Sequence, residues 1–342
     1  MKNVMKEEVH AEKGLRNMTP EVNKEGLYSK KFMIESTSLC NLKCPLCPVP
    51  SHLHRNTGHM EMHTYKDVID DIAGYAKKMD LWNFGEPFLN PKIFEMIKYA
   101  TDKNLKVRVS TNSTFLGEEE VEKIFWSNLS SIIVCLDGAT KETHERYRIG
   151  SQFEKVVEGI SRLAERKRAL GRDLPFIRLQ FIVFSYNEHE IDAMIAWAEK
   201  MQVDQLALKN ASLGTWIDEN VRKKIARKLL PTNEKYKKYI VEGEKLDLKT
   251  EGKACSWAYA NGVVLSNGDV TTCCYDSSGR HVFANVHKDG GLMNVLRSEK
   301  MQEVRKQILN WELPLCKTCQ YSDYGSTLIN FQYGDDKAKG LS

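Results

Sequence analysis

Three cysteines lie close together in the segment CNLKCPLC, where Cys40, Cys44 and Cys47 form a C-x3-C-x2-C pattern. Thiolates are soft ligands that zinc and iron-sulfur clusters select, and three on one loop can face a single metal centre. Zinc needs a fourth ligand, and His52 and His54 lie nearby in the sequence. A 4Fe-4S cluster held by three thiolates instead leaves one iron open to another ligand. This segment alone allows either metal centre.

Six more cysteines follow, most of them toward the C-terminus: Cys135, Cys255, Cys273, Cys274, Cys316 and Cys319. A zinc ribbon would have two C-x2-C pairs, and here only the last two residues form one. Nine cysteines cannot all pair as disulfides, and the N-terminal segment lacks the apolar run of a signal peptide. We therefore expect a cytoplasmic protein whose cysteines bind metal.

The composition is ordinary for a globular protein, with 42% hydrophobic and 28% charged residues among 342. Lys and Arg number 50 against 46 Asp and Glu, a net charge of +4, which argues against disorder and against a nucleic-acid-coating role. No stretch approaches the roughly 18 apolar residues that a membrane span requires. We expect neither nucleic acid nor membrane as a partner.

From Lys31 onward, short β-branched or aromatic runs end in turn residues and are followed by helical patterns, which is typical of βα units. The pattern predicts six parallel strands, at residues 31–35, 79–84, 106–110, 131–136, 176–183 and 205–209. Turns at residues 85–87, 111–113 and 137–138 follow three of these strands. Ligands of such sheets bind at the carboxyl ends of the strands, so we expect ligand contacts in these turns.

Helices are predicted from capping and period. Asn90 and Pro91 are typical of an N-cap followed by a first-turn proline, and a helical period of apolar residues follows. Residues 212–254 include the charged stretches VRKKIARKLL and NEKYKKYIVEGEKLDLK, which we interpret as helical. Residues 259–265 and 270–272 flank an Asn-Gly hairpin turn, and one helix is predicted over residues 292–309.

The chain divides into four segments. They are a polar N-terminal arm (1–30), an α/β domain (31–211), a charged helical connector (212–254) and a C-terminal module (255–330). The C-terminal module is too small for a large core, so a metal site is an expected source of its stability.

The segment FMIESTSLCNLKCPLC resembles the cluster loop of the radical S-adenosylmethionine (SAM) superfamily, and further motifs agree in order. Arg55-x-x-Gly58-x-Met60 is similar to what often follows that loop, and NFGEPFLNP resembles the GGEP motif. STNS stands where the family often has TNG, and CLDGATKETHERYR resembles the Ser-Leu-Asp-Gly segment that ends in arginine. Two positions depart from the family, because Phe84 replaces the first glycine of GGEP and Cys135 replaces a serine.

This resemblance implies an α/β fold, a partial (β/α)6 barrel that binds SAM at its top face. Cys40, Cys44 and Cys47 would hold a 4Fe-4S cluster whose open iron binds SAM. The implied SAM contacts are Leu46 at the adenine, Gly85, Glu86 and Pro87 at the ammonium group, and Cys135 and Arg148 at the carboxylate.

The C-terminal cysteines resemble the Twitch module, the shortened form of the SPASM domain, in a layout similar to the 2-deoxy-scyllo-inosamine dehydrogenase family. The resemblance implies one auxiliary 4Fe-4S cluster on four cysteines: Cys255, Cys273, Cys316 and Cys319. Cys274 is then interpreted as a partly buried thiol beside a ligand. Its alternatives are an exchange with Cys273 as ligand, or hydrogen-atom donation to a substrate radical.

By the same resemblance, the protein is a radical SAM oxidoreductase. An external one-electron reductant such as flavodoxin or ferredoxin supplies an electron, SAM is cleaved to a 5′-deoxyadenosyl radical, and that radical takes a hydrogen atom from the substrate. The favoured reaction is the net oxidation of a small polyol, aminocyclitol or sugar, with the auxiliary cluster accepting an electron. The alternative is a maturase that crosslinks or epimerises a peptide or protein. No catalytic side chain is identified, although Lys209 and Asn112 are expected at the barrel mouth.

Overall fold

The computed structural model describes residues 6–9, 29–50, 53, 55, 57–214, 216–242, 245–248, 255–317, 319 and 327–333. Its main sheet contains six adjacent parallel strands. They are β2 (Lys31–Met33), β3 (Lys78–Asp80), β4 (Lys106–Thr111), β5 (Ser131–Cys135), β6 (Phe176–Val183) and β7 (Gln205–Asn210). All six predicted strands are present, and the predicted α/β partial barrel is confirmed.

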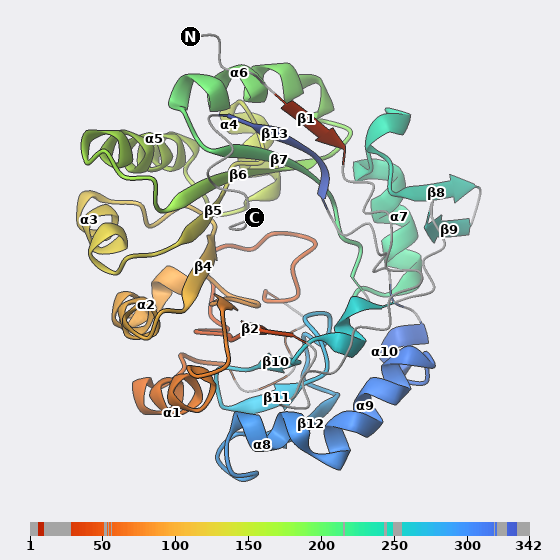
Figure 1. Cartoon of the computed structure of the whole chain (residues 1–342). Coiled ribbons are helices and arrows are strands. Elements are labelled where there is room, and N and C mark those ends of the chain that lie inside the picture. Colours follow the sequence, from red (N-terminus) through yellow and green to blue (C-terminus); the bar gives the residue numbers. More distant parts are fainter. Residues whose placement is uncertain are drawn as a thin grey trace.

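Helices cover the outer face of this sheet, which curves around an interior (Figure 1). They are α1 (Met62–Ile72), α2 (Ile93–Asp102), α3 (Glu118–Trp126), α4 (Lys141–Tyr147), α5 (Phe153–Ala169) and α6 (Ile191–Met201). Strand residues alternate between the two faces. On β4, for example, Val107 and Val109 are buried in the main core, whereas Arg108 and Ser110 on the opposite face are half-buried.

Segments from the two ends of the chain extend the sheet beyond β7. Strand β13 (Thr327–Gln332) pairs antiparallel with β7, and β1 (Lys6–Val9) pairs antiparallel with β13. Ile329 and Phe331 of β13 are buried in the main core. Neither strand was predicted from the sequence.

The C-terminal module meets the other edge of the sheet, at β2. Its three-stranded sheet consists of β10 (Val263–Val264), β11 (Asp269–Thr271) and β12 (Val282–Asn285). Ile34 forms a parallel bridge with Val264, and the backbone N–H of Glu35 donates to the Val264 carbonyl at 2.8 Å. The predicted Asn-Gly hairpin lies between β10 and β11, where Gly268 has a φ of +83° that favours glycine.

The predicted helix over 292–309 is two helices, α8 (Leu292–Arg297) and α9 (Glu299–Leu309), followed by α10 (Pro314–Lys317). Ser298 separates α8 from α9, because its extended backbone ends the first helix and its hydroxyl caps the second at the N–H of Met301. The prediction of a single helix was therefore wrong.

Two further helix predictions need correction. Helix α2 begins at Ile93 rather than at Pro91, because the side chain of Asn90 accepts from the N–H of Lys92 in a turn that precedes the helix. Among the described residues of the connector, the one α-helix is α7 (Glu219–Leu229). Its second charged stretch forms a hairpin of β8 (Tyr239–Glu242) and β9 (Lys245–Leu248). Tyr239 is buried there, and its hydroxyl accepts from the N–H of Leu213 at 3.2 Å.

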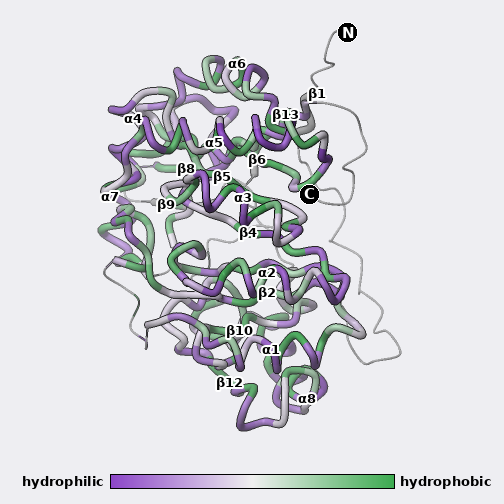
Figure 2. Tube along the Cα trace, turned by 90° about the vertical axis from the view of Figure 1, so that its left-hand side faces the viewer, coloured by the Kyte–Doolittle hydropathy of each residue, from purple (hydrophilic) through white to green (hydrophobic). Residues whose placement is uncertain are grey.

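Hydrophilic and hydrophobic stretches alternate along the helices (Figure 2). This alternation is expected for helices that bury one apolar face against a sheet. Within the part of the chain that is described, every helix is too short or too polar to cross a membrane.

Candidate functional site

The three-cysteine loop follows β2 at the carboxyl end of the barrel strands. Cys44 is buried, Cys40 and Cys47 are half-buried, and the three thiols are close enough to interact electrostatically. Burial raises the pKa of Cys47 to about 12 and raises the pKa values of Cys40 and Cys44. A thiolate in such surroundings requires a positive partner, which a metal centre supplies. The donor set therefore fits the cluster that the sequence implies.

Histidines do not add an evident ligand to this loop. His59 Nδ1 lies 2.9 Å from Thr37 Oγ1, and His63 Nε2 lies 3.3 Å from Thr64 Oγ1. His52 and His54 lie outside the described residues. Among the described residues, no group of three or more His, Cys, Asp or Glu side chains is close enough together to hold a single metal ion.

Gly85 fixes the turn after β3 against the cysteine loop. Its φ is +86°, and a Cβ atom at this position would lie 2.5 Å from the carbonyl oxygen of Thr37. The next residue, Glu86, donates its backbone N–H to the carbonyl of Leu39 at 2.7 Å. Pro87 begins a short 3-10 turn, Pro87–Leu89. Only glycine permits this close approach, so Gly85 positions the backbone that is predicted to contact SAM.

Glu86 ties together the turns that follow β3 and β4. Its Oε1 accepts from Phe88 N–H at 3.1 Å and from Thr111 Oγ1 at 2.8 Å, and its Oε2 accepts from Asn112 N–H at 2.6 Å. Burial raises the pKa of Glu86 to about 7, although these hydrogen bonds oppose the shift. The carboxylate thus has internal partners, and its contact with the SAM ammonium group stays a prediction.

Arg148 forms a buried ion pair with Asp137, the residue that follows β5 by two positions. Arg148 Nε donates to Asp137 Oδ2 at 2.6 Å, and Asp137 Oδ1 accepts from Ile182 N–H at 2.6 Å. Arg148 Nη1 also lies 3.9 Å from Cys44 Sγ. The structure therefore places the predicted carboxylate-binding arginine beside the three-cysteine loop.

Cys135 and Leu46 are the remaining predicted SAM contacts. Cys135 is buried at the end of β5, where burial raises its pKa to about 11 and Gln180 Nε2 lies 3.5 Å from its sulfur. Cys135 also interacts electrostatically with Arg148 and Lys209. Leu46 is buried in an apolar cluster that includes the aromatic rings of Tyr147 and Phe184.

A second thiol site lies in the C-terminal module. One pocket is lined by all four cysteines of the predicted auxiliary cluster, together with apolar and aromatic residues: Cys255, Cys273, Cys316, Cys319, Trp257, Tyr275, Ile308, Trp311 and Leu315. Cys274 does not line this pocket. Four thiols that line one pocket could hold a cluster that is fully ligated by protein, and their role as ligands stays a prediction.

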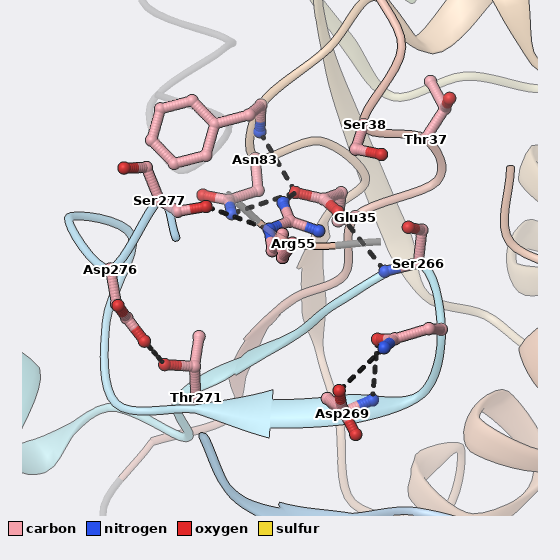
Figure 3. Close-up of polar contacts among 12 residues, drawn as sticks. Glu35, Thr37, Ser38, Arg55, Asn83, Ser266, Asp269, Thr271, Asp276 and Ser277 are labelled. Carbon is pink, nitrogen blue, oxygen red and sulfur yellow. Dashed lines mark hydrogen bonds and ion pairs between the residues drawn. The ribbon is translucent and has the colours of Figure 1, made fainter. Parts of the chain in front are cut away.

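Glu35 and Arg55 join the cysteine loop to the C-terminal module (Figure 3). Glu35 is fully buried, and its Oε2 accepts from Arg55 Nη2 at 2.6 Å and from Asn83 Nδ2 at 3.2 Å. Its Oε1 accepts from Ser266 N–H at 3.3 Å, and Arg55 Nε donates to the carbonyl of Ser277 at 2.9 Å. The sequence analysis did not identify Glu35 as a site residue. The one signal that could have done so is its position at the end of the first predicted strand.

The fold and the three-cysteine loop are those of a radical SAM partial barrel. Residues 34–198 match the radical SAM superfamily, and residues 255–320 match the SPASM iron-sulfur cluster-binding domain. The chain therefore contains a radical SAM domain followed by a SPASM domain. The cofactors of these domains are SAM, the 4Fe-4S cluster that binds it, and an auxiliary 4Fe-4S cluster.

Two relatives illustrate the range of similar proteins. AdoMet-dependent heme synthase of Methanosarcina barkeri is 32% identical over 168 residues, which cover 49% of this chain and 46% of that protein. Mycofactocin maturase MftC of Mycobacterium tuberculosis is 24% identical over 296 residues, covering 80% of this chain and 71% of that protein. The chain thus spans less than half of the first relative's length.

Two solved structures share the fold. BtrN in complex with AdoMet and 2-DOIA has a TM-score of 0.53 and 17% identity, over 85% of this chain and 93% of BtrN. Streptococcus suis SuiB bound to the precursor peptide SuiA has a TM-score of 0.60 and 14% identity, over 82% of this chain and 67% of SuiB.

Proposed function

We propose that this protein is a radical SAM oxidoreductase that oxidises a substrate held inside the barrel. One observation carries the proposal: three thiols lie near Arg148 at the carboxyl end of the barrel strands, and four further thiols line one pocket of the C-terminal module. Two thiol sites of this kind suit a reaction in which one site starts the radical chemistry and the other accepts an electron.

When bound, SAM and the clusters supply hydrogen-atom abstraction and electron transfer. The chain's own residues would bind and orient SAM. Asp137 holds Arg148 through Nε, and the remainder of the guanidinium group would bind the carboxylate of SAM. The apolar cluster around Leu46 would exclude water from the adenine. The positive charge of the SAM ammonium group would favour the ionised form of Glu86.

Seven cysteines are proposed as cluster ligands: Cys40, Cys44 and Cys47 for the SAM-binding cluster, and Cys255, Cys273, Cys316 and Cys319 for the auxiliary cluster. The auxiliary cluster would accept the electron that the substrate loses, and an external reductant such as flavodoxin or ferredoxin would supply the first electron. Substrate oxidation therefore requires both sites, whereas SAM cleavage requires only the first.

The proposed substrate is a small polyol, aminocyclitol or sugar, and the similarity in fold to BtrN bound to 2-DOIA is consistent with it. A second candidate is a peptide, because the similarity to the mycofactocin maturase extends through both domains. The structure of SuiB with its precursor peptide also shows that this fold accommodates a peptide.

The experiment compares iron content with SAM cleavage. Anaerobically reconstituted protein should hold about eight iron and eight sulfide per chain, four of each per cluster. Replacing Cys40, Cys44 and Cys47 by Ala should remove one cluster and abolish formation of 5′-deoxyadenosine. Cys316→Ala with Cys319→Ala should remove the other cluster but retain SAM cleavage.

Cys135→Ser is the control, because Cys135 is not a proposed ligand and serine stands there in the family. It should retain both clusters. Stoichiometric zinc in place of iron, or SAM cleavage by the triple variant, would contradict the proposal.

A further inference from the structure

The interior face of the barrel carries a strong excess of positive charge. Residues of β2–β7 that alternate with core residues point to this face. Those with cationic side chains are Lys31 and Lys106, which are exposed at the starts of their strands, and the half-buried Lys78, Arg108, Arg178 and Lys209. On the same face of these six strands, Asp80 is the single carboxylate. An interior of this charge attracts anions.

One interior arginine already binds a carboxylate. Arg108 donates from Nε to Asp80 Oδ1 at 2.9 Å and from Nη2 to Asp80 Oδ2 at 3.1 Å. This is the two-pronged geometry with which a guanidinium group recognises a carboxylate. Lys31 also contacts Asp80, at 2.7 Å, so this carboxylate is fully engaged by its two neighbours.

Arg178 and Lys209 lie deeper along the same face and have no such partner. Among the described residues, neither side chain forms a hydrogen bond or an ion pair, although both are half-buried. Strand register places Arg178 opposite Gln205 of β7, four residues before Lys209. Burial and the charge of Arg178 lower the pKa of Lys209 to about 8, whereas burial and the charge of Arg108 lower the pKa of Arg178 to about 10.

We infer that Arg178 and Lys209 bind a carboxylate group of the substrate, in the way that Arg108 binds Asp80. This inference rests on the proposed function, because it assigns the substrate of that reaction to the barrel interior. A carboxylate there would relieve the repulsion between the two cations and supply the hydrogen bonds that they lack.

The inference narrows the substrate class. The protonated amine of an aminocyclitol would be repelled by this interior, whereas a sugar acid or the carboxylate of a peptide would be attracted. Lys209 also interacts electrostatically with Cys135 and Cys274, so an anchored carboxylate would bring the adjoining carbon atoms toward these two thiols.

Benzoate is the probe, and its neutral analogue benzamide is the comparison. Binding to reconstituted protein would be measured by equilibrium dialysis at neutral pH, without SAM cleavage. Wild-type protein should bind benzoate and not benzamide. Arg178→Gln and Lys209→Gln should each weaken benzoate binding about tenfold or more, as expected for loss of a charged hydrogen bond. Lys209→Arg keeps the charge and should restore most of the binding.

Lys155→Gln is the matched control, because Lys155 is exposed on α5 and its replacement removes the same charge far from the interior. It should bind benzoate as the wild-type protein does. Iron content and unfolding temperature, measured for each variant, would show whether Arg178→Gln and Lys209→Gln remain folded. Lys209→Met replaces the charge with an apolar side chain of similar length and should weaken benzoate binding in the same way.

Three results would overturn the inference. They are equal binding of benzamide and benzoate, unchanged benzoate binding in both charge-removing variants, and preferential binding of phenyl phosphate, which would indicate a phosphate site. Failure of the proposed function looks different. Benzoate binding by wild-type protein that cannot cleave SAM would leave the carboxylate site in place and remove the radical reaction.

Discussion

His144 contacts Asp137, which forms the ion pair with Arg148 at the predicted SAM site, and both ring nitrogens of His144 have partners. The N–H of Asp137 donates to Nδ1 at 3.2 Å, and Nε2 lies 3.0 Å from Ser151 Oγ. This arrangement requires a neutral ring with its proton on Nε2. Because the side chain is fully buried, desolvation lowers the pKa of His144 from 6.5 to about 4.

His144 should therefore make stability depend on pH. Between pH 6.5 and about 4 the unfolded chain binds a proton that the folded protein excludes, so stability falls as the pH falls through this window. The loss should amount to about 3 kcal/mol at most. His144→Gln should abolish this loss of stability on acidification, although it lowers stability at pH 7. Urea unfolding at pH 7 and at about pH 4 would measure the difference. The exposed His189→Gln variant should keep the wild-type pH dependence; if His144→Gln keeps it too, the assignment is wrong.

At the scale of elements, the Glu35–Arg55 ion pair connects the cysteine loop to the C-terminal module. The two side chains are 0% and 9% exposed. Removing one member of a buried ion pair leaves an uncompensated charge in a medium of low dielectric constant. The exposed pair between Arg166 and Glu122 has side chains that are 39% and 56% exposed, so its charges are solvated.

Arg55→Met should lower the free energy of unfolding by about 3–5 kcal/mol, whereas Arg166→Met should lower it by no more than about 1 kcal/mol. Adding Glu35→Gln to Arg55→Met should recover part of the loss, because it removes the buried charge. Chemical denaturation of the four proteins measures these effects. Equal costs for Arg55→Met and Arg166→Met would show that the buried pair does not fasten the module.

The elements differ in how far their sequences predicted them. Strand β6 was predicted at its observed bounds, because its core residues alternate and a turn follows it. Strands β8 and β9 were missed, since the many lysines and glutamates around Tyr239 resemble a solvated helix. The spacing of the cysteines indicated metal sites, whereas the assignment of each cysteine to a cluster came from the family resemblance and stays a prediction. The pairing of Glu35 with Arg55, and the placement of Arg178 and Lys209 on one face of neighbouring strands, depend on strand register and on contacts between distant segments, which no local pattern encodes.

At the scale of the whole molecule, distant segments cover both edges of the six-stranded parallel sheet. Strand β10 of the module continues from β2, while β13 and β1 continue from β7. An uncovered edge strand presents unpaired backbone groups to solvent and to other chains. Strand β13 pairs with β7, which is far away in the sequence, so the role of β13 in the barrel could not be predicted from a local pattern. Strand β13 thus covers the edge of the barrel sheet at β7.

Deleting residues 327–342 should therefore destabilise the barrel itself. It removes the buried Ile329 and Phe331, exposes the edge of β7, and leaves β1 without its partner. Loss of one large core side chain alone costs about 2–5 kcal/mol, so the variant should unfold at a clearly lower temperature and aggregate. Deleting residues 334–342 keeps β13 and serves as the control. Thermal unfolding with light scattering compares the two proteins, and equal unfolding temperatures would mean that β13 adds nothing to the stability of the barrel.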